Sequence, residues 1–204
     1  EYVFKLPKIG TLTIFKDRQP KGELRTATIT KKNNKYYISI VTIQKFNTNI
    51  KNDDSQVGVD VGISFFMSLS TGEQIENPRH TLCREKQLRV LNRSLSRKKK
   101  GSIQREKAKL KVAKMHEKLS NTRKDFLHKQ SCRLIREFDT IVVEDLKVKN
   151  MIKFWYLSKH IADVSWSEFF TQLEYKSKWN GNDFLKINPK YTSQTCSDCG
   201  EVDK

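Results

Sequence analysis

Asp60 is an acidic residue whose neighbouring residues leave room for a bound ion or phosphate. It lies in residues 57–62, where three valines alternate with two glycines and the acid. At the two-residue period of a strand, the valines share one face and Asp60 points to the other, where the glycines leave room for an ion or a phosphate. An acid in an apolar strand is unfavourable unless a cation or donors meet it. A solvent-facing Asp on an amphipathic strand is the alternative, and this segment alone does not decide between the two.

A second apolar segment, residues 140–146, also carries acids, Glu144 and Asp145. Its continuous apolar run predicts a central parallel strand that is buried on both faces. Successive side chains point to opposite faces, so one of the two acids can meet Asp60, and we expect it to be Glu144. Two carboxylates on neighbouring strands repel each other unless a cation lies between them. Their oxygens suit Mg²⁺ or Mn²⁺, which in a two-metal site support hydrolysis of a phosphodiester.

The C-terminal cysteines have the spacing of a metal site. Cys196 and Cys199 form a C-x-x-C pair followed by glycine, which lets both thiolates reach one ion. Structural zinc needs four ligands, so we expect Zn²⁺ to bind only if a second Cys pair is present. A redox C-x-x-C is the alternative, although such a motif usually opens a helix after a strand.

Positive charge is concentrated in one part of the chain. The net charge is +17, and residues 84–124 hold sixteen Lys or Arg against three Glu, which is +13 in a fifth of the sequence. Charge of this sign and size indicates a polyanionic partner, and nucleic acid is the commonest one in a cell.

The same region has helical periodicity. Leu88, Leu91 and Leu95 form one apolar stripe, and a second stripe runs from Val112 to Phe138. A solvated helical face is the alternative reading of the basic residues, but like charges that lack acidic i,i+4 partners would destabilise the helices. We therefore predict a basic helical hairpin within residues 82–138, with a turn at residues 98–102. Expected contacts to a nucleic-acid backbone are Arg89, Arg93, Arg97, Lys98, Lys99, Lys100, Arg105, Lys109, Arg123 and Lys124.

The remaining elements position these residues. The first 46 residues are rich in β-branched side chains and predict a partial β-barrel that includes one hairpin. A strand and a turn after residue 62, and a third strand from Gln74, predict a sheet of the ribonuclease-H type. Predicted elements are strands at 2–6, 12–15, 23–30, 36–43, 57–62, 63–70 and 183–187, a polar linker at 47–56, and an aromatic-rich helix at 161–179.

Several motifs occur in a recognisable order. They are Val-Gly-Val-Asp60-Val-Gly, Leu-Asn-Arg-Ser-Leu-Ser-Arg-Lys-Lys-Lys at 91–100, Arg123-Lys124-Asp125-Phe126-Leu127-His128-Lys129, Ile-Val-Val-Glu144-Asp-Leu, Ile161-Ala162-Asp163-x-x-Trp166 and Tyr191-Thr-Ser-Gln-Thr-Cys-Ser-Asp-Cys-Gly. Together they closely resemble the TnpB (OrfB) proteins of bacterial insertion sequences, which are compact relatives of the type V CRISPR effectors. The resemblance covers essentially the whole chain.

The resemblance implies an α/β fold with an RNase H-like (RuvC) nuclease domain. It implies part of a wedge-type β-barrel at 1–50, the RuvC-like domain at 57–188 with its helical insertion at 82–138, and the first half of a zinc ribbon at 189–204. The implied activity is Mg²⁺-dependent cleavage of DNA directed by a guide RNA, in a transposon-associated protein traditionally called a transposase. Asp60 and Glu144 would be the first and second catalytic acids. We expect a cytoplasmic, nucleoid-associated bacterial protein with no membrane segment.

The chain also departs from that family. Members carry a second Cys pair and then a third catalytic Asp, in an Asp-x-Asn-Ala-Ala stretch, downstream of the first pair, whereas this sequence stops at Lys204. The resemblance therefore implies a fragment that is cut at both ends and does not cleave DNA alone. Two alternatives remain: a remnant that binds nucleic acid without cleaving it, and a poorly folded product of a pseudogene.

Overall fold

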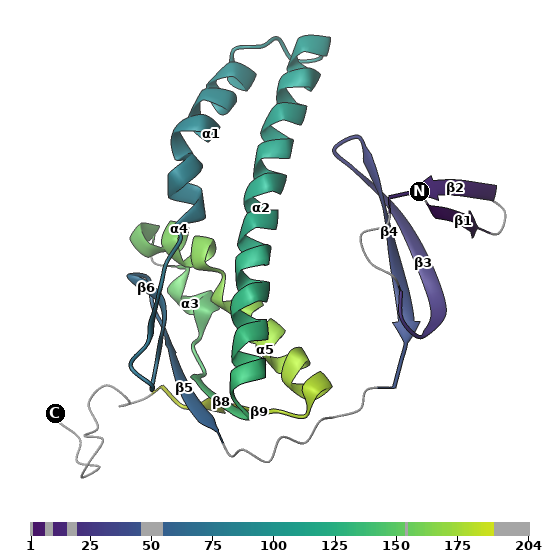
Figure 1. Ribbon diagram of the computed structural model, residues 1–204. Helices are drawn as coiled ribbons and strands as arrows, with labels where there is room; N and C mark the ends of the chain where they lie inside the picture. The colour runs from purple at the N-terminus through teal and green to yellow at the C-terminus, as the bar shows by residue number, and fades with distance from the viewer. Residues whose placement is uncertain (1, 7–9, 16–19, 46–54, 154, 190–204) are drawn as a thin grey trace. The chain divides into compact units, whose positions relative to one another are not determined.

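The computed structural model describes residues 2–6, 10–15, 20–45, 55–153 and 155–189 (Figure 1). It divides the chain into two compact units, Glu1–Phe46 and Asn47–Lys204.

The N-terminal unit contains two antiparallel hairpins. Strands β1 (Tyr2–Leu6) and β2 (Gly10–Ile14) pair with each other, and so do β3 (Glu23–Lys32) and β4 (Lys35–Ile43). The two asparagines between β3 and β4 have φ angles of 49° and 62°, as a type I′ turn requires. The predicted hairpin is confirmed. The described residues of this unit form two separate two-stranded sheets, so the partial barrel expected from the sequence is not seen in them.

The second unit is built on a mixed five-stranded sheet with the order β7-β6-β5-β8-β9. Strand β5 is central, as the sequence predicted: it pairs antiparallel with β6 and parallel with β8, which in turn pairs parallel with β9. The strands are β5 (Gln56–Val61), β6 (Phe65–Leu69), β7 (Gln74–Glu76), β8 (Thr140–Glu144) and β9 (Asp183–Ile187).

Five helices belong to the described part of this unit: α1 (His80–Ser96), α2 (Ile103–Glu137), α3 (Val148–Met151), α4 (Trp155–Val164) and α5 (Trp166–Asn180). Helices α1 and α2 confirm the predicted helical hairpin (Figure 1). The single helix predicted at 161–179 is wrong, because Ser165 has a φ of 58° and ends the helical path between α4 and α5. None of the described helices combines the length and the apolar character needed to cross a membrane.

One face of the sheet carries the core. Valines of β5 and the two buried residues of β8, Ile141 and Val143, belong to one apolar cluster with residues of α2, α4 and α5, among them Leu127, Phe169 and Leu173. The prediction that β8 is buried on both faces is wrong. Its side chains alternate between buried and half-buried, and only the buried ones, Ile141 and Val143, belong to the core cluster.

The turn of the hairpin is held by side chains that bond to its backbone. Ser102 caps α2 by accepting a hydrogen bond from the backbone N–H of Arg105, at 3.2 Å. The guanidinium of Arg105 donates to the carbonyls of Leu95 and Lys98, at 3.1 and 2.9 Å, and so satisfies acceptors at the C-terminal end of α1. Arg105 therefore joins the two helices at their distal ends.

The base of the hairpin is fixed by Asp163 of α4. Arg79, at the start of α1, forms no side-chain cap, and Asp163 accepts hydrogen bonds from the backbone N–H of Thr81 instead, at 3.0 and 3.2 Å. The same carboxylate pairs with Arg123 of α2 at 2.9 Å, and its side chain is only 8% exposed. Burial raises the pKa of Asp163, but the hydrogen bonds from Thr81 and Arg123 outweigh burial and hold the pKa below its ordinary value. One buried acid thus links α1, α2 and α4.

Replacing Asp163 with Asn should destabilise the fold by about 2–4 kcal/mol, because Arg123 would keep a half-buried charge without its partner. Urea unfolding followed by circular dichroism measures this change. The matched control is Asp125→Asn, which removes an exposed i,i+4 partner of Lys129 and should cost less than about 0.5 kcal/mol. Equal losses for the two variants would contradict the anchoring role of Asp163.

The contribution of Asp163 should also depend on pH. Its pKa is lower in the folded than in the unfolded chain, so the stabilisation is fully present above the unfolded pKa of about 4 and is lost as the pH falls through the folded pKa. The difference in unfolding free energy between the wild type and Asp163→Asn should therefore shrink between pH 6 and pH 3. A difference that stays constant over this range would be inconsistent with the ion pair.

Candidate functional site

Asp60 and Glu144 lie side by side on the open face of the sheet. Strands β5 and β8 are parallel, and their last paired residues are Val59 and Val143. Asp60 and Glu144 each come one position after the Val59–Val143 pair that ends the β5–β8 ladder, so both side chains project away from the buried valines. Glu144 belongs to β8, whereas Asp145 lies beyond its end and is exposed. The structure thus brings together the two acids that sequence reasoning selected.

The pKa of Asp60 is affected by the neighbouring Glu144. Burial, in the form of hydration lost to the adjacent strands, raises the pKa of the Asp60 carboxyl, and the negative charge of Glu144 raises it further. A raised pKa means that the ionised form of Asp60 is disfavoured in this position. A cation between the two carboxylates would reverse that effect, because it favours the charged form of both.

Among the described residues, the face around the two acids is open. Ser68 pairs with Asp60 across β5 and β6, and the backbone N–H of Gly58 donates to the hydroxyl of Ser70 at 3.0 Å. On the other side of Glu144, Leu185 and Ile187 of β9 are 51% and 44% exposed. A ligand can therefore approach the acid pair from solvent.

The acid pair does not have a third carboxylate, cysteine or histidine beside it among the described residues. No group of three or more side chains of these types is found there that could hold a metal ion. The predicted zinc half-site cannot be compared with the structure, since Cys196 and Cys199 lie outside the described residues.

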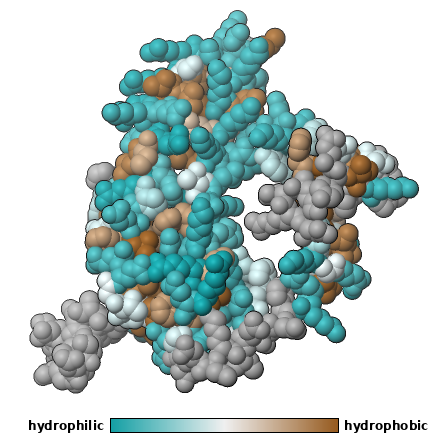
Figure 2. Space-filling view, in the orientation of Figure 1, coloured by the Kyte–Doolittle hydropathy of each residue, from teal (hydrophilic) through white to brown (hydrophobic). Residues whose placement is uncertain are grey.

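The ten basic residues predicted to contact nucleic acid fall into two groups. Those with a partner among the described residues are Arg89 with Glu85, Lys109 with Glu106, Lys124 with Glu168, Arg123 with Asp163, and Arg105 with backbone carbonyls. No ion pair with another described residue is formed by Arg93, Arg97, Lys98, Lys99 and Lys100. Figure 2 shows hydrophilic side chains covering most of the visible surface of the hairpin.

Sequence reasoning did not predict that Arg105 and Arg123 join helices, or that a further cation, Lys159, lies beside the hairpin. Arg105 and Arg123 join helices, and nothing in their local sequence distinguishes them from the exposed residues around them. Lys159 of α4 donates to Glu85 of α1 at 2.8 Å and so lies beside the hairpin, although it is 74 residues away in the chain. A contact over that separation leaves no periodic signal in the sequence.

Comparison with known proteins gives two family matches. The OrfB_IS605 family, described as "Probable transposase", matches residues 29–154, and the family described as "Cas12f1-like, TNB domain" matches residues 166–204. The first match alone covers more than half of the chain.

Individual relatives agree with these families. A protein of Streptomyces pristinaespiralis named "Putative RNA-guided DNA endonuclease" is 44% identical over 147 residues, which are 72% of this chain and 37% of that protein. The protein of Escherichia coli (strain K12) named "Putative RNA-guided DNA endonuclease InsQ" is 35% identical over 214 residues, which are 98% of this chain and 53% of that protein. The chain thus spans about half or less of the length of these curated relatives.

A solved structure also aligns with this chain. The cryo-EM structure of a Cas12f1–sgRNA–target DNA complex contains a protein that is 17% identical, with a TM-score of 0.48, over 86% of this chain and 45% of that one.

Replacing Glu144 with Gln should lower the pKa of Asp60 towards its ordinary value, because the variant removes the neighbouring negative charge but leaves the loss of hydration in place. Carboxyl-carbon NMR titration of the aspartates measures the shift. Asp145→Asn is the control, since Asp145 does not contribute to the raised pKa, and its titration curve for Asp60 should match the wild type. An unchanged Asp60 pKa in Glu144→Gln would show that the two carboxylates are not neighbours in solution.

Proposed function

The chain belongs to the OrfB_IS605 (TnpB) family, and from this premise we propose that its parent protein is an RNA-guided DNA endonuclease whose nuclease centre includes Asp60 and Glu144. The observation that carries the proposal is the adjacency of these two acids on the open face of the central strands. The printed names of the relatives support guide RNA and target DNA as the partners.

The donor set fits a hard divalent cation. Both candidate ligands are carboxylates, and oxygen ligands of this kind suit Mg²⁺ or Mn²⁺, which also take oxygens from water and substrate phosphate. The mutual repulsion of the two acids is the physical reason why a cation would be held there. When bound, such an ion supplies Lewis-acid catalysis for phosphodiester hydrolysis.

The residues of this chain would bind the metal and give the substrate access to it, but they would not complete the reaction. Asp60 and Glu144 would fix the metal, and the open face of β5 and β8 would give a phosphodiester access to it. Two protein ligands form a partial site, and so we assign cleavage to the longer parent protein and not to this chain alone. Zn²⁺ at Cys196 and Cys199 belongs to the same proposal, on condition that a second cysteine pair is present.

The basic hairpin would hold a nucleic-acid backbone without reading its sequence. Its cations that form no ion pair with a described residue provide charge that can neutralise phosphates, and such contacts position a strand but carry no base specificity. This charge does not depend on the acid pair. It therefore supports one alternative function, a remnant that binds nucleic acid without cleaving it.

In the parent protein, Asp60→Ala should reduce DNA cleavage at least about 100-fold while leaving RNA binding unchanged, because only metal binding is lost. A plasmid-cleavage assay and an RNA-binding assay on the same preparations measure the two effects. Asp145→Asn is the matched control, and it should cleave at the wild-type rate.

The same site can be tested in the 204-residue chain. Electron paramagnetic resonance of Mn²⁺ should show weaker binding for Asp60→Asn and for Glu144→Gln than for the wild type or Asp145→Asn. Wild-type cleavage by the Asp60→Ala parent would remove the nuclease assignment of this pair. If neither the wild-type parent nor any variant cleaves DNA while all of them bind RNA, the binding-only alternative is favoured.

A further inference from the structure

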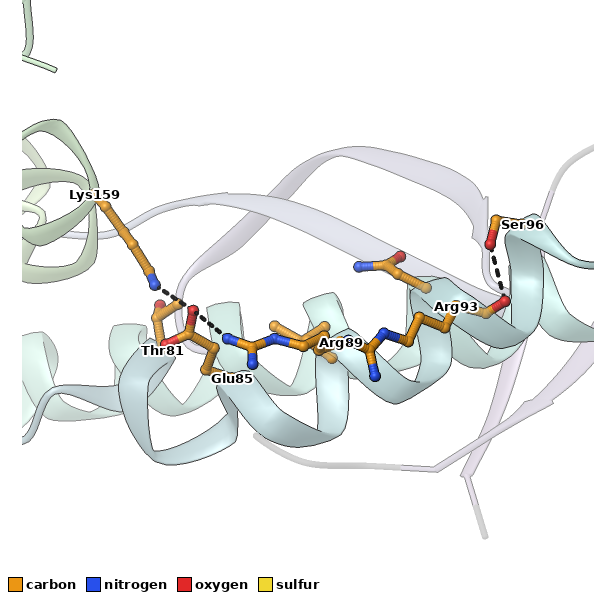
Figure 3. A pocket seen from close by; sticks show the side chains of 8 residues that line it. Thr81, Glu85, Arg89, Arg93, Ser96 and Lys159 are labelled. Carbon is orange, nitrogen blue, oxygen red and sulfur yellow. Dashed lines mark hydrogen bonds and ion pairs between the residues drawn. The ribbon is translucent and has the colours of Figure 1, made fainter.

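An elongated hollow runs beside α1, where α4 approaches it (Figure 3). Its volume is about 520 Å³. It is lined by eight residues, all of which except Leu88 carry a polar or charged group: Thr81, Glu85, Leu88, Arg89, Asn92, Arg93, Ser96 and Lys159. It belongs to the second unit and is formed by elements other than β5 and β8, which carry the acid pair.

Three cations and a single acid line this hollow. Glu85 binds Lys159 at 2.8 Å and Arg89 at 3.6 Å, and these contacts appear as dashed lines in Figure 3. Arg93 forms no ion pair with a described residue, and its side chain leans towards the end of α1 where Glu85 lies (Figure 3). Glu85 therefore occupies the place of an anion between two of the three cations.

The cationic lining continues beyond this hollow. Arg93 also lines a second hollow of about 410 Å³, together with Arg97 and Lys98. Arg89, Arg93 and Arg97 are spaced four residues apart, so they follow one side of α1 with a rise of about 6 Å per step. A row of regularly spaced cations suits a linear polyanion with repeating charges better than a single small anion.

We propose that this α1–α4 hollow is a phosphodiester site, in which a phosphate of a nucleic-acid strand replaces the Glu85 carboxylate as the partner of Lys159 and Arg89. The next phosphates of the strand then meet Arg93 and Arg97. This inference rests on the proposed nucleic-acid function, which it refines by locating the strand and by identifying Glu85 as an internal competitor.

The exchange is feasible because the competing ion pairs are exposed. The side chains of Glu85, Lys159 and Arg89 are 37%, 48% and 59% exposed. Exposed pairs contribute little to stability and are weakened by salt, so an incoming phosphate can displace one. Asn92 and Ser96 supply amide and hydroxyl groups that can donate to phosphate oxygens.

The competitor role of Glu85 gives the first test. Fluorescence anisotropy of labelled 20-nucleotide single strands, one DNA and one RNA of the same sequence, reports the Kd of the full 204-residue chain at 150 mM salt in EDTA. Glu85→Gln should bind about two- to fivefold more tightly than the wild type. Asp125→Asn also removes one exposed carboxylate from an ion pair with lysine, but outside the hollow, and it should change the Kd much less.

The cationic row gives the second test. Arg89→Gln/Arg93→Gln should weaken binding about tenfold and reduce the slope of log Kd against log salt by about 1.4, because two phosphate contacts are lost. Lys111→Gln/Lys114→Gln removes the same charge from exposed positions of α2 and should change the slope much less. The probe, DNA or RNA, whose Kd rises more in Arg89→Gln/Arg93→Gln identifies the strand that the hollow holds.

Two outcomes would overturn the proposal. Equal effects of the two double variants on both probes would show that binding follows overall charge and not this hollow. Equal effects of Glu85→Gln and Asp125→Asn would show that Glu85 does not compete with phosphate. Glu85→Gln removes only exposed ion pairs and should leave the fold intact, so the Glu85 result stands even if a double variant is destabilised. Because EDTA excludes metal, failure here is distinct from failure of the Asp60–Glu144 site.

Discussion

The register between β5 and β8 is the constraint on which the candidate site depends. Pairing of Val59 with Val143 puts apolar residues of both strands on the helix-covered face and turns Asp60 and Glu144 to the open face. A slip of one residue in either strand would bury an acid and expose a valine, because side chains alternate with a period of two. The burial of the core therefore fixes the relative position of the two carboxylates before any ligand is present.

The basic hairpin depends on a different interaction. Its distal half projects from the apolar cluster, and α1 has no fully buried residue of its own. What fixes α1 at its base is the buried carboxylate of Asp163, which binds the backbone of Thr81 and the guanidinium of Arg123. The motif that contains Asp163 is therefore explained by the attachment of the hairpin, with no need for a direct role in chemistry.

Regular elements were predictable from the sequence, whereas long-range polar contacts were not. The strand at Asp183–Ile187 and the central position of β5 follow from apolar patterns that are local in the chain. The break at Ser165 was missed because one left-handed residue interrupts a helical pattern without changing its apolar spacing. The contact between Lys159 and Glu85 joins residues 74 positions apart, and only the folded chain brings them together.

The two acids at the junction of α1 and α4, Asp163 and Glu85, differ in how deeply they are buried. Asp163 is almost fully buried and accepts several hydrogen bonds, so removing its partners would leave a charge in a poorly hydrated place. Glu85 binds its cations at the surface, where water can replace them at little cost. The hairpin can thus keep its attachment through Asp163 while the pairs of Glu85 exchange, and this division lets one junction serve both folding and the binding of an anionic strand.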